Sequence, residues 1–345
     1  MSSWLLIIPW LAPLLLLPVP VNRTIRWLQA LAALPALATA MLAADGLTGE
    51  FDWLLLGTRL GIDDTGRLFL LYSSLVWLAA SLYTLLRPAL ATGRSRFRIA
   101  FLLAMSGNFL LILAADMLSF YLGFALMGLS AYGMIVAQGT GVAIKAGRRY
   151  LGWTIAGELA LFSGMVLLAS RAGGRLFTDL ASVEPGSAGL VLILVGFGVK
   201  MALPGLHFWL PQAYAVTPAP AVAVLSGAMI KAGLLGWLRF LPPGDGELAG
   251  WGQALIVIGL AGIFLGLILG LLQQQPRLML GYSSISKMGV LTLGMGATLV
   301  WPGAAPALVS ALALYAWLLA DLPPVTALET RMVRPTTRIL DRNGR

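Results

Sequence analysis

The chain has 345 residues, of which 59% are hydrophobic and 11% are charged, and its formal net charge is +9. So few charges exclude a soluble globular domain of this size and indicate a polytopic α-helical membrane protein. There is no cysteine, which excludes thiolate metal sites, iron–sulfur clusters and disulfides. With only one histidine, a haem or zinc site built by the protein is not expected either. We therefore expect no cofactor.

Apolar runs of about 20 residues, enough to cross a bilayer, recur along the chain. The first residues, MSSWLLIIPW, lack the basic start and small-residue cleavage site of a signal peptide, so we interpret them as the beginning of a membrane helix. We predict an all-α protein with about eleven transmembrane helices. Their approximate ranges are 4–21, 25–44, 67–86, 99–115, 117–137, 150–170, 188–204, 219–240, 250–272, 278–299 and 304–321.

The distribution of positive charge predicts the orientation. Most of the 23 Lys and Arg residues lie in the tail and in the links that follow odd-numbered spans. Cytoplasmic links of membrane proteins are enriched in these residues. The pattern predicts a multi-pass protein of the cell (inner) membrane, in contact with lipids, with its N-terminus outside and its C-terminus in the cytoplasm. It also accounts for the positive charge without a nucleic-acid partner.

Three of the four lysines lie inside predicted spans. A lysine in hydrocarbon costs about 2.5–3.5 kcal/mol on insertion scales, so it normally faces a protein interior or a wet cavity. Lys231 is deep in its span, and Lys200 precedes Pro204 and Gly205, where we expect the helix to break. Lys287 lies near the start of its span. For each lysine the alternative is a side chain that snorkels to the membrane surface.

Two further titratable residues accompany these lysines. Glu158 is the one carboxylate well inside a predicted span. It is a candidate partner of Lys200, or else a structural polar contact between helices. His207, just after the expected break, titrates near neutral pH when unperturbed. It is a candidate proton relay between Lys200 and Lys231, or else a hydrogen-bonded structural residue.

The stretch 196–240 reads GFGVKMALPGLHFWLPQAYAVTPAPAVAVLSGAMIKAGLLGWLRF. It resembles the antiporter-like membrane subunits of respiratory complex I (NADH–quinone oxidoreductase), of multisubunit cation/proton antiporters and of membrane-bound hydrogenases. The family pattern is a lysine in a broken helix, a histidine before Trp-Leu-Pro, a proline-rich link and a second lysine. Lys200, His207, Trp209 to Pro211 and Lys231 match it in order and spacing. The segment 276–289, PRLMLGYSSISKMG, resembles a second family signature.

The resemblance implies a fold of two inverted five-helix repeats, each with a broken helix. On this basis we expect an N-terminal three-helix segment at 1–98, one complete repeat at 99–240, an incomplete second repeat at 249–322 and a basic cytoplasmic tail at 323–345. It also implies proton or sodium movement along a central polar axis. In that axis Lys200 would be a carrier tuned by Glu158, Lys287 the link to the second half-channel, and Ser283 and Ser284 would hold water.

The chain departs from the family pattern at several positions. Phe124-Ala125 stands where the family usually has Trp-Glu, and Ala125 cannot titrate. Gln212 and Tyr214 replace the usual acid and the second histidine of the proline-rich link, and Lys287 replaces an uncharged polar residue. The broken helix of the second repeat is also missing from this sequence. We therefore expect a partner subunit to complete the second half-channel.

Three functions remain open from the sequence. The first is an ion-translocating membrane subunit of a hetero-oligomeric complex, coupled to redox or antiport chemistry in partner subunits. The second is a structural or anchoring subunit that does not conduct. The third is the membrane subunit of an inorganic-carbon uptake complex driven by an ion gradient, with a peripheral catalytic partner. No catalytic constellation appears, so any enzyme activity would belong to a translocase complex as a whole.

Overall fold

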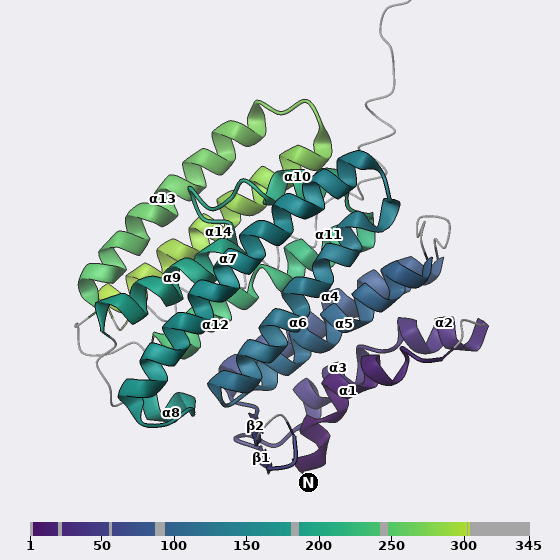
Figure 1. Ribbon diagram of the computed structural model, residues 1–345, viewed down its shortest axis with the longest axis horizontal. Helices are drawn as coiled ribbons and strands as arrows, with labels where there is room; N and C mark the ends of the chain where they lie inside the picture. The colour runs from purple at the N-terminus through teal and green to yellow at the C-terminus, as the bar shows by residue number, and fades with distance from the viewer. Residues whose placement is uncertain are drawn as a thin grey trace, which may run out of the picture.

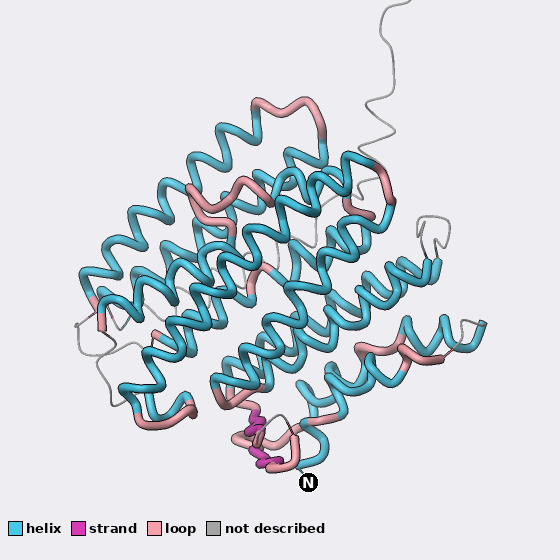
Figure 2. Tube along the Cα trace, viewed as in Figure 1, coloured by secondary structure: helices cyan, strands magenta, loops and turns pink. Residues whose placement is uncertain are grey.

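The computed structural model describes residues 3–19, 23–54, 57–86, 94–180, 186–241, 248–301 and 303. Within them the protein is mostly helical, and its long helices lie side by side (Figure 1). The predicted span 304–321 and the predicted tail 323–345 lie outside the described residues. The described connections between the long helices are mostly short loops (Figure 2).

The middle of the bundle consists of four long helices that follow the predicted apolar runs. Their positions confirm the predictions to within a few residues at most ends. The exception is the last of them, which begins at Gly141 rather than near 150, because the Thr140 side chain accepts a hydrogen bond from the Ala143 amide at 3.2 Å and caps the helix there. The four are α4 (Asp64–Leu86), α5 (Arg94–Leu113), α6 (Met117–Ile135) and α7 (Gly141–Ala172).

The N-terminal spans predicted at 4–21 and 25–44 are not single helices. Proline removes a backbone donor and clashes with the preceding turn, so it favours the start of a helix, and Pro9 and Pro35 lie in the first turns of the helices Ile8–Leu15 and Leu34–Leu42. The Arg98 guanidinium donates hydrogen bonds to the carbonyls of Leu16 and Leu17, which caps the chain as it leaves the first helix. The segment consists of α1 (Ile8–Leu15), α2 (Arg23–Ala30) and α3 (Leu34–Leu42).

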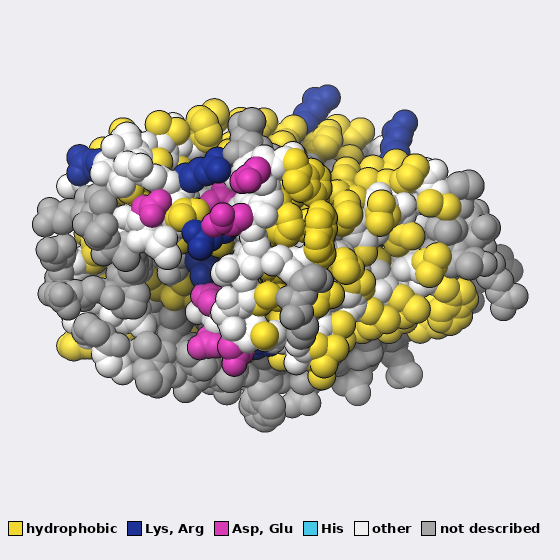
Figure 3. Space-filling model, turned by 90° about the horizontal axis from the view of Figure 1, so that it is seen from below, with side chains coloured by type: hydrophobic (Ala, Val, Ile, Leu, Met, Phe, Trp, Pro, Cys, Tyr) yellow, Lys and Arg dark blue, Asp and Glu magenta, His cyan; other side chains and the backbone are white. Residues whose placement is uncertain are grey.

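The expectation of an all-helical chain is wrong in the polar link that follows. Strands β1 (Thr48–Phe51) and β2 (Thr58–Gly61) form a short antiparallel hairpin at the foot of the bundle (Figure 2). Asp116, 1% exposed, accepts hydrogen bonds from the amides of Arg59 at 2.9 Å and Ser119 at 2.8 Å. It therefore joins the hairpin to the N-terminus of α6. Seen from this end, acidic and basic side chains gather together beside a large apolar surface (Figure 3).

The last two described helices are α13 (Ala249–Leu271) and α14 (Pro276–Val300), which confirm the runs predicted at 250–272 and 278–299. They pack through glycines: a Cβ added at Gly289 would lie 2.6 Å from the Gly259 carbonyl oxygen. Such small residues allow helix backbones to approach closely in a membrane, where apolar burial alone does not drive helix association.

Six helices of the described residues are long and apolar enough to cross a membrane. The predicted count of eleven is therefore supported only in part. A further apolar helix, Ser187–Met201, is shorter than a typical span. The six are Asp64–Leu86, Ser95–Leu113, Met117–Gln138, Gly141–Ala172, Ala219–Phe240 and Ala249–Leu271.

A bidentate ion pair ties the start of α4 to a distant part of the chain at the hairpin end. Arg239 donates to Asp63 Oδ2 at 2.7 Å through Nη1 and to Oδ1 at 2.6 Å through Nη2. Burial raises the pKa of Asp63, but the hydrogen bonds and charge of Arg239 outweigh it, so this pKa lies below its ordinary value. A depressed carboxyl pKa stabilises the folded state at pH values above the pKa of the unfolded chain.

Asp63→Asn is therefore expected to lower the melting temperature at pH 7, by an amount equivalent to about 1 kcal/mol or less because the pair is partly exposed. As the pH falls through the folded-state pKa, below about 4, wild-type Asp63 also becomes neutral and the difference should disappear. Thermal unfolding of both proteins in detergent, at pH 7 and at a pH below the folded-state pKa, measures this difference. A difference that is unchanged at low pH would mean that the ion pair is not its cause.

Candidate functional site

The helix expected to break does so three residues earlier than predicted. Helix α9 (Ser187–Met201) ends before Ala202, whose φ of 54° is left-handed, and not at Pro204 and Gly205, which lie in the following turn. The Leu203 amide donates to the Gly198 carbonyl at 3.1 Å, so the turn closes on itself. The break thus leaves the end of α9 inside the bundle, with Lys200 in its last turn.

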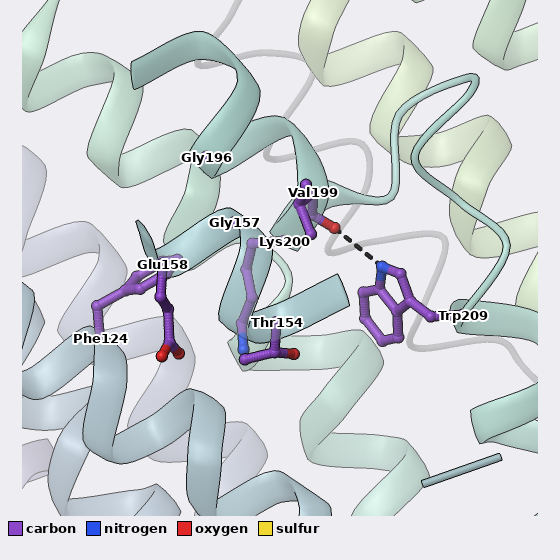
Figure 4. Close-up of a pocket in the computed structure, with 8 residues that line it drawn as sticks. All are labelled: Phe124, Thr154, Gly157, Glu158, Gly196, Val199, Lys200 and Trp209. Carbon is purple, nitrogen blue, oxygen red and sulfur yellow. Dashed lines mark hydrogen bonds between the residues drawn. The ribbon is translucent and has the colours of Figure 1, made fainter. Parts of the chain in front are cut away.

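A side chain from beyond the break satisfies the end of α9. Trp209 Nε1 donates to the Val199 carbonyl oxygen at 2.9 Å (Figure 4), and both groups are buried. The same carbonyl also accepts a hydrogen bond from the Ala202 amide at 3.1 Å, so the indole supplies a second hydrogen bond at the break, where no lipid group could do so. The indole of the Trp-Leu-Pro sequence therefore closes the break.

Two glycines bring α7 and α9 into close contact beside this break. A Cβ added at Gly196 would lie 2.9 Å from the Gly157 carbonyl oxygen, and one at Gly157 would lie 2.9 Å from Val199 Cβ. Since Glu158 follows Gly157 and Lys200 is one turn after Gly196, this contact carries both charged side chains to the same place. Glu158 is 6% exposed and Lys200 is 5% exposed.

Glu158 and Lys200 line one small cavity (Figure 4). They interact electrostatically across it, but they do not form a salt bridge. The arrangement leaves space between an acid and a base inside an otherwise apolar bundle. The lining residues are Phe124, Thr154, Gly157, Glu158, Gly196, Val199, Lys200 and Trp209.

The Lys200 ammonium is held by a tyrosine. Its Nζ donates to Tyr150 Oη at 3.4 Å, and this hydroxyl donates in turn to the Gly128 carbonyl at 2.7 Å. The ammonium also lies 5.6 Å from the centre of the Phe124 ring, a distance at which a cation is attracted to the ring face. The C-terminal end of α9 adds the negative end of its helix dipole. These contacts stabilise the charge without fixing it to a carboxylate.

The Glu158 carboxylate is less satisfied. Its Oε1 is buried, and no hydrogen-bond partner for it occurs among the described residues. A Cβ added at Gly128 would lie 2.4 Å from this oxygen, so the absence of a side chain on α6 makes the room that Glu158 occupies. A buried acceptor without a partner is unfavourable by about 1–3 kcal/mol. Such a group at a cavity is typical of a functional site.

Packed aromatic rings separate the cavity from the hairpin end. Phe197 lies with its ring centre 5.5 Å from Phe124, 5.8 Å from Phe120 and 5.6 Å from Phe240. Phe177, on the short helix α8 (Phe177–Leu180), adds a further ring 5.1 Å from Phe240. The rings leave Lys200 shielded on that side.

The span predicted at 219–240 is interrupted as well. It comprises α11 (Ala219–Val224), a π-helical turn (Leu225–Met229) and α12 (Ala232–Phe240). Lys231 lies at this interruption and is 2% exposed. It donates a hydrogen bond to the Ser226 carbonyl oxygen, which the wider turn makes accessible, and it lies 5.6 Å from the centre of the Tyr72 ring. Its depth agrees with a lysine that faces the protein interior.

The other predicted residues lie near these lysines without a direct link to Lys200. His207 is buried between α9 and α10 (Leu210–Val216), stacked on Phe208, and its Nδ1 finds no partner in the described part of the chain. No described contact joins it to Lys200 or Lys231. Lys287 and Ser283 on α14 are half-buried, whereas Ser284 is buried.

Sequence reasoning missed Tyr150 and Thr154, which lie beside the candidate pair. Tyr150, Thr154 and Glu158 recur at intervals of four residues, which places them on one face of α7. That polar line in an apolar helix was a usable signal. The hydrogen bond from Trp209 to Val199 had no signal in the sequence, because it depends on how the loop folds back on α9.

The protein is mostly helical, and two of its buried lysines lie at interrupted helices. This combination is typical of membrane proteins with polar sites inside a helical bundle. The family described as "NADH:quinone oxidoreductase/Mrp antiporter, TM" matches residues 114–328. The chain belongs to this family, as the motifs around Lys200 and Lys231 indicate.

Several characterised proteins are similar over part of their length. NADH-quinone oxidoreductase subunit N of Ectopseudomonas mendocina is 32% identical over 210 residues, covering 59% of this chain and 42% of that protein. Hydrogenase-4 component B of Escherichia coli is 28% identical, and the match covers 70% of this chain and 37% of that protein. A chain of the Mrp complex from Dietzia sp. has the same fold, with a TM-score of 0.80 at 22% identity. The match covers 91% of this chain and 36% of that one. This chain therefore spans less than half the length of these relatives.

Proposed function

We propose that this chain is an ion-translocating membrane subunit of a multisubunit complex, with Lys200 as its central carrier. The observation that carries the proposal is the cavity that Lys200 and Glu158 both line without forming a salt bridge. A buried lysine held by neutral groups and one nearby carboxylate can accept and release a proton with little rearrangement. The antiporter-like relatives, named as subunits of complex I and hydrogenase-4, support this function.

The proposed path continues from Lys200 to Lys231 and then to Lys287. Lys287 is the proposed link to the second half-channel. His207 lies in the loop between the first two carriers, and water is needed to connect it to either of them. Residues 99–240 form the proposed complete repeat, and 249–322 belong to the second. Redox or antiport chemistry in the partner chains drives the movement, and the basic links face the cytoplasm.

One observation favours the second candidate function, a subunit that anchors others without conducting. Ala125 on α6 cannot titrate, so this chain lacks an acid where related subunits have one. Glu158 on α7 supplies a carboxylate to the same cavity, which is why we prefer the conducting function. The choice depends on whether Lys200 works in the intact complex.

The test is to purify the protein in mild detergent, identify every chain that co-purifies, and reconstitute the complex in liposomes. Lys200→Ala is expected to leave assembly intact and to lower ion flux by about 100-fold or more, the range typical of a lost proton-transfer group. Lys145→Ala is the matched control, because Lys145 is an exposed lysine on α7. Unchanged flux in the Lys200→Ala complex would mean that the chain is a scaffold.

A further inference from the structure

One face of α6 carries two phenylalanines between two polar sites. Asp116, Phe120, Phe124 and Gly128 recur at intervals of four residues, so they follow one another along the helix. Asp116 binds the hairpin, and Phe124 lines the cavity. Gly128 borders Glu158 Oε1. About 18 Å of helix separates Asp116 from Gly128, at a rise of about 1.5 Å per residue. The two phenylalanines occupy the space between these polar sites.

The polar site at the hairpin end is buried and hydrogen-bonded. Besides the two backbone amides described above, Asp116 Oδ2 accepts a hydrogen bond from the Ser119 hydroxyl at 2.7 Å. The Thr58 hydroxyl of β2 lies 3.2 Å from the Ser119 hydroxyl. All three side chains are buried. The polar cluster therefore extends from the hairpin to the residue that directly precedes Phe120.

Phe120 is the centre of an aromatic layer that closes over this cluster. Three rings from α8, α9 and α12 meet it edge to face, an arrangement that aromatic rings favour. Every ring of the layer except Phe177 is at most 2% exposed. Measured from the Phe120 ring centre, the other members of the layer are Phe240 at 5.7 Å, Phe197 at 5.8 Å, Phe177 at 5.9 Å and Phe124 at 6.2 Å.

Cations contact the aromatic layer from both of its sides. At the hairpin end, the Arg239 guanidinium carbon lies 5.9 Å from the centre of the Phe177 ring, and the same guanidinium forms the ion pair with Asp63. On the cavity side, the Lys200 ammonium lies 5.6 Å from the centre of the Phe124 ring. A cation is attracted to a ring face but finds no room between closely packed rings, so each charge stays on its own side.

We infer that the aromatic layer is a seal that keeps water and ions at the hairpin end out of the Lys200 cavity. A charge inside the layer would lose its hydration without gaining a hydrogen bond, and hydrophobic constrictions close membrane pores by excluding water. The role of the seal rests on the proposed function, because a carrier does work only if ions cannot cross the membrane through one continuous opening. The closure itself depends on packing and can be tested without measuring ion flux.

The test introduces a single thiol into the cavity, which is possible because the chain has no cysteine. Thr154→Cys places this thiol beside Glu158 and Lys200 (Figure 4). Right-side-out membrane vesicles that contain the complex are exposed briefly to external Ag⁺, a small cation that binds thiols. The chain is then unfolded, and alkylation with a maleimide measures the fraction of the thiol that is still free. In the proposed orientation, with the basic links in the cytoplasm, the external Ag⁺ meets the hairpin end.

With the layer intact, the thiol is expected to react slowly. Phe120→Ser removes the central ring and adds a hydroxyl that holds water, so it should raise the rate of reaction by about tenfold or more. Phe120→Leu fills most of the same space with apolar groups and should keep the slow rate. Phe240→Ser removes another ring of the layer and carries the same expectation as Phe120→Ser, should that variant fail to fold. Phe101→Ser is the matched control, because Phe101 is a buried phenylalanine outside the layer, with its ring centre 4.9 Å from that of Trp77.

The inference is overturned if the thiol reacts as fast with the layer intact as in Phe120→Ser, or if both serine variants of the layer leave the reaction slow. An equal rise in Phe101→Ser would also overturn it, since the bundle would then be loosened in general. The Lys200→Ala complex separates the two proposals. If Phe120→Ser opens the cavity while Lys200→Ala keeps full ion flux, the seal is right and the proposed function is wrong. If Lys200→Ala loses the flux while the thiol stays unreachable in both serine variants, only the seal is wrong.

Discussion

Glu158→Gln is expected to lower ion flux about as strongly as Lys200→Ala does, by about 100-fold. The substitution keeps the shape of the side chain but removes the negative charge that stabilises the Lys200 ammonium across the cavity. Assembly should be preserved, because Glu158 Oε1 makes no hydrogen bond within the described structure that could be lost. Flux and size-exclusion profiles of the reconstituted complex measure both effects.

The position of the acid can be tested by moving it to the neighbouring helix. Ala125 lies one turn before Gly128, the residue that borders Glu158 Oε1. We expect Ala125→Glu to recover at least about tenfold of the flux lost in Glu158→Ala, because it returns a carboxylate to the cavity from α6. Leu126→Glu in the same background is the control, since it points about 100° further around the helix.

Wild-type flux in Glu158→Gln would exclude this carboxylate from the pathway. If Glu158→Gln strongly lowers the flux and Ala125→Glu does not recover the flux lost in Glu158→Ala, the acid must come from α7, on the same helix face as Tyr150 and Thr154. Either outcome would decide which helix carries the acid in this chain.

The helices were predictable wherever one apolar run made one span, as for α4, α6 and α13. Prediction was wrong where backbone chemistry interrupts a run without changing its hydropathy. Pro9 and Pro35 lie where helices begin within the N-terminal runs, and the π-helical turn before Lys231 leaves no sign in the amino-acid composition. The β-hairpin was missed because its strands are short and follow one another in a polar link.

The site was predictable in its charges but not in its neutral contacts. Lysines inside apolar runs are rare enough to identify Lys200 and Lys231 directly. Glu158 followed because no other carboxylate lay inside a predicted span. Tyr150 and the room at Gly128 depend on how α6 and α7 pack against each other, and a single sequence does not record that packing.

A pair of glycines on α6 should separate stability from function. A Cβ added at Gly123 would lie 2.6 Å from the Leu111 amide nitrogen and 2.9 Å from the Gly107 carbonyl oxygen. Backbone atoms cannot move aside as a side-chain end can, so Gly123→Ala must push α5 and α6 apart. We expect a loss of about 1–3 kcal/mol, the range for overpacked cores, seen as a lower melting temperature of the purified protein.

Gly128→Ala is the matched variant, with the same added methyl on the same helix. Its Cβ would meet Glu158 Oε1 at 2.4 Å, the mobile end of a side chain, so the helices can keep their packing while the carboxylate moves. We expect a nearly unchanged melting temperature and a clear loss of ion flux. If Gly128→Ala instead unfolds the protein, or leaves the flux intact, the space at Gly128 does not position the acid. Since the two variants differ only in what the methyl meets, the comparison isolates the placement of Glu158 from the stability of the bundle.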